Sequence, residues 1–179
     1  KVREMAAREV RWAGTGLEDA ELVVVAYGTA ARIASTAVDR ARAAGLKVGL
    51  FRPITLFPFP TRELRALTTR AKGFLVVELS MGQMVEDVQL AVLGAAPVAF
   101  YGRTGGSVPV PSEIVTAIER LARAVSATDD LDWGPDPTTL IELPGEAAIS
   151  VDEAEADPDP LSLIDEGAWW AREHEVVTR

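Results

Sequence analysis

The stretch that decides the fold reads Leu22-Val-Val-Val-Ala-Tyr-Gly-Thr-Ala-Ala-Arg32. Its first six residues form an uninterrupted apolar run, which is typical of a strand covered on both faces in a parallel sheet. Helical spacing of apolar residues follows as far as Gly45, which suits the end of a helix. A second apolar run over residues 48–51 then completes a strand–helix–strand unit. The members of the apolar helical stripe are Ile33, Ala37, Val38 and Ala41.

The same alternation continues along the chain. Apolar runs at 74–79 and 97–101 predict two more strands, and a short stretch at 9–12 can add a fifth strand at an edge of the sheet. Helical segments at 30–44, 62–70 and 83–93 separate the strands, and a fourth at 113–125 follows the last strand. This order predicts an α/β fold, a three-layer α/β/α sandwich with right-handed crossovers.

A stiff, apolar loop interrupts the pattern after the second long strand. It reads Pro53-Ile-Thr-Leu-Phe-Pro-Phe-Pro60, and its three prolines forbid a regular helix or a central strand. We expect Thr61 to cap the helix that follows.

Charge divides the chain into two parts. Residues 1–128 carry 16 Lys and Arg against 12 Asp and Glu, whereas residues 129–179 carry 2 against 15. We therefore expect an α/β domain over 9–128 and an acidic extension over 129–179, with residues 1–8 as the end of a helix from a preceding domain. The extension contains strand-like residues at 140–143 and the pair Trp169-Trp170, so we expect it to pack in part.

Composition excludes several classes of function. The chain has no Cys, which excludes disulfides, thiolate-held iron–sulfur clusters and a thiol nucleophile. Its only histidine, His174, lies in the extension, so no serine–histidine triad or two-histidine metal site is expected. The apolar runs are too short to span a membrane, and no basic, aromatic-rich cluster indicates nucleic acid. We expect a soluble, cytoplasmic protein.

Two glycine turns at strand ends are candidate anion sites. Gly28 and Thr29 follow one strand, and Arg103, Thr104, Gly105 and Gly106 follow another. Backbone N–H groups in such turns can hold a phosphate, with an arginine paired to it. Neither turn has the full glycine spacing of a nucleotide motif, so small-residue packing turns are the alternative.

Three carboxylates, Glu78, Glu86 and Asp87, lie near the end of the third long strand. Glu78 and Glu86 are candidates for an acid/base pair or a metal site, although the sequence fixes no geometry for them. Met81 and Met84 beside them are expected to serve in packing.

Four motifs in register strongly resemble the 2-oxoacid:ferredoxin oxidoreductases. They are Val25-Ala-Tyr-Gly-Thr-Ala-Ala-Arg-Ile33, Gly49-Leu-Phe-Arg-Pro-Ile-Thr-Leu-Phe-Pro-Phe-Pro60, Glu78-Leu-Ser-Met-Gly-Gln-Met-Val-Glu-Asp-Val-Gln-Leu-Ala-Val92 and Phe100-Tyr-Gly-Arg-Thr-Gly-Gly106. The chain is most similar to the α-type subunits that act on branched-chain substrates (3-methyl-2-oxobutanoate) or on 2-oxoglutarate.

The resemblance implies a domain like the transketolase carboxy-terminal domain, with a mostly parallel five-stranded sheet and one antiparallel edge strand, for which 9–12 is the candidate. It implies thiamine diphosphate, magnesium, iron–sulfur clusters and coenzyme A in the complete enzyme. It also implies a preceding thiamine-pyrimidine-type domain, other subunits, ferredoxin as the electron acceptor and an oligomer. No motif for these cofactors is present here, so we expect no cofactor, no metal and no catalytic residue in this chain.

Three functions stay open on this basis. The chain can be a non-catalytic part of an oxidative decarboxylase, or a small anion or coenzyme A binding module that uses the two glycine turns. It can also be an assembly domain that uses an apolar contact patch. The interface residues expected for that patch are Phe57, Phe59, Met81, Gln83 and Met84.

Overall fold

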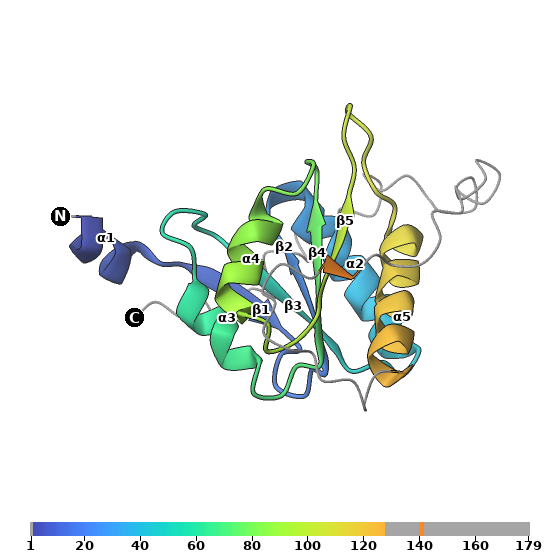
Figure 1. Ribbon diagram of the computed structural model, residues 1–179. Helices are drawn as coiled ribbons and strands as arrows, with labels where there is room; N and C mark the ends of the chain where they lie inside the picture. The colour runs from blue at the N-terminus through green and yellow to red at the C-terminus, as the bar shows by residue number, and fades with distance from the viewer. Residues whose placement is uncertain (1, 128–139, 142–179) are drawn as a thin grey trace.

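The computed structural model describes residues 2–127 and 140–141, and all structural statements below concern these residues. They form one mixed sheet with the strand order β1-β3-β2-β4-β5-β6 (Figure 1). The strands are β1 (Trp12–Thr15), β2 (Leu22–Ala26), β3 (Val48–Pro53), β4 (Gly73–Glu78), β5 (Val98–Gly102) and β6 (Leu140–Ile141). The helices are α1 (Val2–Glu9), α2 (Gly28–Ala43), α3 (Thr61–Leu67), α4 (Met84–Val92) and α5 (Pro111–Ala127).

The pairing of the strands confirms the expected fold class. β3, β2, β4 and β5 run parallel, and β1 pairs with β3 in the antiparallel direction at one edge. At the other edge the sheet gains a sixth strand, the two-residue β6, which runs parallel to β5. Because β2, β3, β4 and β5 are parallel, the loops after all four leave from the same edge of the sheet, here called the carboxyl edge.

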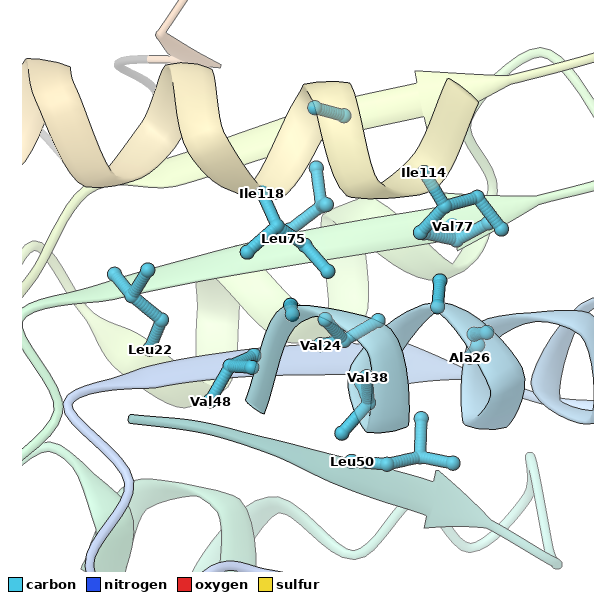
Figure 2. Packing of buried hydrophobic residues seen from close by; sticks show 14 of the residues in the cluster. Leu22, Val24, Ala26, Val38, Val48, Leu50, Leu75, Val77, Ile114 and Ile118 are labelled. Carbon is cyan, nitrogen blue, oxygen red and sulfur yellow. The ribbon is translucent and has the colours of Figure 1, made fainter. Parts of the chain in front are cut away.

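Two helical layers cover the sheet, with α2 and α5 on one face and α3 and α4 on the other (Figure 1). All five residues of β2 are buried, and they alternate between the two faces. Leu22, Val24 and Ala26 point to the α2/α5 layer, where Figure 2 shows them with side chains of neighbouring strands and helices. Val23 and Val25 belong to the second core under α3 and α4. Burial on both faces explains the continuous apolar run.

The edge strand lies three residues later than expected, at Trp12–Thr15 and not at 9–12. Glu9 is the last residue of α1, so it is not available to the sheet. The strand begins where Trp12 stacks on Phe51 of β3, with ring centroids 4.8 Å apart and planes 11° apart. This aromatic contact fixes the start of the pairing.

The expectation that Thr61 caps α3 is wrong, because Thr61 is the first residue of the helix and Pro60 occupies the cap position without a side-chain hydrogen bond. The Thr61 backbone N–H donates to the Phe59 carbonyl at 2.8 Å, so the chain turns one residue earlier.

None of the described helices is long and apolar enough to cross a bilayer. Of the predicted acidic extension, 129–179, the structure describes only the two residues of β6. His174 and the pair Trp169-Trp170 lie outside the described residues.

Candidate functional site at the carboxyl edge

Glu78 is the last residue of β4, and its side chain is fully buried at 0% exposure. Its Oε2 accepts hydrogen bonds from Ser80 Oγ at 2.7 Å and from the backbone N–H groups of Gln83 at 3.2 Å and Met84 at 3.0 Å. Its Oε1 accepts from the Val85 N–H at 2.9 Å. The carboxylate thus satisfies N–H groups at the start of α4, which have no partner within the helix.

These hydrogen bonds bear on the prediction that Glu78 and Glu86 form an acid/base pair or a metal site. Both oxygens of Glu78 are occupied by donors inside the protein, whereas Glu86 and Asp87 are exposed on the first turn of α4. Within the described residues, no group of three His, Cys, Asp or Glu side chains is arranged to hold a metal ion. Glu78 acts here as a helix cap, a role that was not among the predictions from sequence.

The pKa of Asp87 is raised above its ordinary value. Partial desolvation is the largest cause, and the negative charges of Glu86 and Glu78 add to it. The start of α4 is therefore a crowded, negatively charged surface.

The shape of the loop between β4 and α4 depends on two glycines. Gly82 has φ +99°, a conformation that side-chain-bearing residues rarely adopt. At Gly102 of β5, an added Cβ would lie 2.6 Å from the Ser80 carbonyl oxygen, so only glycine permits this approach. The Arg103 N–H also donates to the Glu78 carbonyl at 3.1 Å. The loop is therefore held from inside by Glu78 and from the side by the end of β5.

The expected interface residues divide between surface and core. Phe57 is 73% exposed, Met81 is 83% exposed, and Gln83 is exposed as well. Phe59 is half-buried against the core under α3 and α4. Met84 is only 3% exposed, because it is the first residue of α4 and packs inside that core. Its expected part in packing is confirmed, while the interface role of this group stays a prediction.

The second glycine turn is closed by an ion pair. Arg103 Nη2 lies 2.6 Å from Glu113 Oε1, and Glu113 Oε2 accepts from the Val110 N–H at 3.1 Å. The second bond is the return half of a capping box at the start of α5. The Arg103 guanidinium therefore already has a carboxylate partner within the chain.

Tyr101 lies under this ion pair. The Arg103 guanidinium carbon is 5.2 Å from the centroid of the Tyr101 ring. The Tyr101 hydroxyl is buried without a hydrogen bond of ordinary geometry in the described structure. Burial and the neighbouring Glu113 carboxylate raise the pKa of Tyr101.

The first glycine turn, at Gly28 and Thr29, is exposed at the start of α2. β4 separates β2 from β5 in the sheet, so the two glycine turns begin about 10 Å apart. The structure therefore gives no single cradle built from Gly28, Thr29, Thr104, Gly105 and Gly106 in its described part.

Similarity to known proteins shows the family of the chain. The model of pyruvate:ferredoxin oxidoreductase core domain II matches residues 20–114, which is more than half of the chain. The chain belongs to the pyruvate:ferredoxin oxidoreductase core domain II family. The matched residues of this core domain II contain β2 to β5 and every loop of the carboxyl edge.

Similar proteins confirm the resemblance to the 2-oxoacid:ferredoxin oxidoreductases that was seen in the sequence. The chain is 47% identical over 114 residues to ketoisovalerate oxidoreductase subunit VorB of Methanothermobacter marburgensis, covering 64% of this chain and 32% of the relative. It is 39% identical over 106 residues to 2-oxoglutarate synthase subunit KorA of Methanothermobacter thermautotrophicus, covering 59% and 28%. The chain thus spans about a third of the length of the relatives it matches.

A solved structure supports the fold of the domain. It is the 2-oxoglutarate:ferredoxin oxidoreductase from Magnetococcus marinus with 2-oxoglutarate, coenzyme A and succinyl-CoA bound. The TM-score is 0.51 at 24% sequence identity, over 60% of this chain and 19% of that chain.

Proposed function

We propose that this chain is a non-catalytic assembly domain of a 2-oxoacid:ferredoxin oxidoreductase. The observation that carries the proposal is the family match over the whole carboxyl edge, joined to the state of the polar groups there. Glu78 caps α4, and Arg103 and Glu113 bind each other. A catalytic acid or base needs a group free to exchange a proton with a substrate, and these side chains are engaged in holding loops.

The complete enzyme would decarboxylate a 2-oxoacid oxidatively, form an acyl-CoA and pass two electrons to ferredoxin. The relatives are named for ketoisovalerate and for 2-oxoglutarate, which supports a branched-chain 2-oxoacid or 2-oxoglutarate as the substrate. Thiamine diphosphate, magnesium, iron–sulfur clusters and coenzyme A would be held by other domains and subunits. The absence of Cys from this sequence fits cluster ligation elsewhere.

The alternative of a small anion or coenzyme A module is not part of the proposal. Arg103, the one basic residue expected to take part, is bound to Glu113 in the described structure. Freeing it would break a charge-assisted hydrogen bond at the start of α5.

The proposal is tested by tagging the chain in cells that make it and purifying it under mild conditions. We expect the other oxidoreductase subunits to be recovered with it, in a complex that forms acyl-CoA from a 2-oxoacid and reduces ferredoxin. The isolated 179-residue chain should show no turnover. Turnover by the isolated chain, or recovery without such subunits, would contradict the proposal.

A further inference from the structure

We propose that residues 79–83, here called the Met81 loop, form a preshaped docking knob that inserts Met81 into an apolar socket bordered by Lys or Arg side chains. The socket would lie on another domain or subunit of the same oxidoreductase. This inference rests on the proposed function and names the contact through which the domain would be held.

Exposure singles out the Met81 loop. At 83%, Met81 is the most exposed large apolar side chain in the described part of the chain, and Leu79 in the same loop is 40% exposed. Burying such a side chain in a partner would remove most of its apolar surface from water, which favours association. A flexible thioether also fits irregular sockets well.

The loop is rigid where a docking knob has to be rigid. Glu78 accepts bonds from Ser80, Gln83 and Met84 on either side of Met81. The Ser80 carbonyl is fixed against Gly102, and Gly82 adopts a conformation that favours glycine. Because the loop is ordered before association, little conformational entropy is lost when the partner binds.

Charge identifies the rim of the socket. Glu86 and Asp87 are exposed on the turn of α4 that follows the loop, and Glu78 adds a third negative charge beneath them. Glu86 and Asp87 are neighbours in the chain and share one exposed turn, so two negative charges stand side by side beside the Met81 loop. A partner that places Lys or Arg side chains around an apolar socket would relieve this repulsion.

The relatives give the source of the socket. The chain covers 32% of VorB and 28% of KorA, so most of each relative lies outside the matched domain. The Met81 loop lies inside the residues that the family model matches. The remainder of the enzyme is therefore the source of the socket that would cover Met81 of this chain.

The test uses the assembled enzyme with a diazirine amino acid in place of Met81. Leu90, which is 63% exposed near the other end of α4, is the matched control position. We expect crosslinks from position 81 to an apolar segment of another domain or subunit, with Lys or Arg beside it, and none to that segment from position 90. Crosslinks from position 81 only to a second copy of this domain, or to no protein, would overturn the proposal.

Substitution supplies an independent measurement. Met81→Asp should weaken association with the partner roughly thirtyfold, which is the effect of losing a buried anchor, whereas Leu90→Asp should change it less than about threefold. Met81→Leu should restore binding to within about threefold. Equal binding by wild type and Met81→Asp overturns the knob while the proposed function stands. If the wild-type chain associates with no oxidoreductase subunit, both proposals fail.

Discussion

The loops after β4 and β5 leave the same edge of the sheet and are built in opposite ways. In the first, the charge is inside, because Glu78 is buried and the apolar Met81 faces solvent. In the second, the two charges pair with each other across the turn, and the Arg103 and Glu113 side chains are 39% and 14% exposed. A loop that turns its apolar residue outward and keeps its carboxylate inside is suited to contact with a protein. The second loop also exposes an apolar residue, Val108, but only to 42% against 83% for Met81.

The largest expected effect on stability comes from the first loop, when the Glu78 side chain is removed. Glu78→Ala should lower the free energy of unfolding by about 3 kcal/mol, because N–H groups at the start of α4 lose a charged acceptor and a buried side chain leaves a cavity. Urea unfolding of the chain measures this. Glu86→Ala, on the exposed face of the same turn, is the control and should change stability by less than about 0.5 kcal/mol. Equal effects at the two positions would show that Glu78 does not hold the loop.

A smaller effect is expected where the two loops meet. Gly102→Ala would place a Cβ 2.6 Å from the Ser80 carbonyl oxygen. The same Cβ would also overlap the Phe100 ring, so relief has to move that side chain as well as the Met81 loop, which should cost about 1–3 kcal/mol. Thermal unfolding measures the loss, with Thr104→Ala in the neighbouring exposed turn as control. An unchanged melting temperature for Gly102→Ala would contradict the close packing of Ser80 on β5.

The ion pair of the second loop should contribute less. Glu113→Gln removes the negative charge opposite Arg103 and should destabilise the chain by about 1 kcal/mol, since the pair is only partly exposed.

The same variant should lower the pKa of Tyr101, because the Glu113 carboxylate is one cause of its upward shift, although burial will keep it above the ordinary value. Ultraviolet titration reads this directly, and Tyr27→Phe identifies the Tyr101 signal. An unaltered titration would place Glu113 outside the environment of Tyr101.

The smallest effect concerns Asp87. A carboxyl group whose pKa is raised in the folded state opposes folding when it is charged, so its cost is present above its folded pKa and vanishes below its unfolded pKa. Asp87→Asn should therefore stabilise the chain at pH 7 by about 0.3 kcal/mol, given the screening by solvent. The gain should disappear as the pH falls below the usual range of an aspartate. A gain that grows on acidification would contradict the charge crowding.

The sequence predicted the parts of the fold that depend on burial on both faces of the sheet. The apolar runs at 22–27, 48–51, 74–79 and 97–101 lie within two residues of β2, β3, β4 and β5. The edge strand was misplaced because β1 is held by the stacking of Trp12 on Phe51, a contact between residues far apart in the chain. Local pattern carries no information about such a contact.

The candidate site was less predictable for the same reason. Exposed Phe57 and Met81 could be expected from apolar residues in loops, but Met84 belongs to the core because its helix starts there. The capping role of Glu78 could have been predicted, because an acidic residue stands at the end of a buried strand and a few residues before a helix. The pairing of Arg103 with Glu113 depended on how the loop folds back, although Pro111-Ser-Glu113 is a recognisable capping sequence.

Oxidation of the methionines by dilute peroxide tests the central claim most directly, because it reports the exposure of Met81 in the chain alone and in the assembled oxidoreductase. In the chain alone Met81 should oxidise fastest, and Met84, at 3% exposure, should be protected as an internal reference. Assembly should slow the oxidation of Met81 to a rate near that of Met84. Oxidation of Met81 at the same rate in both states would contradict it.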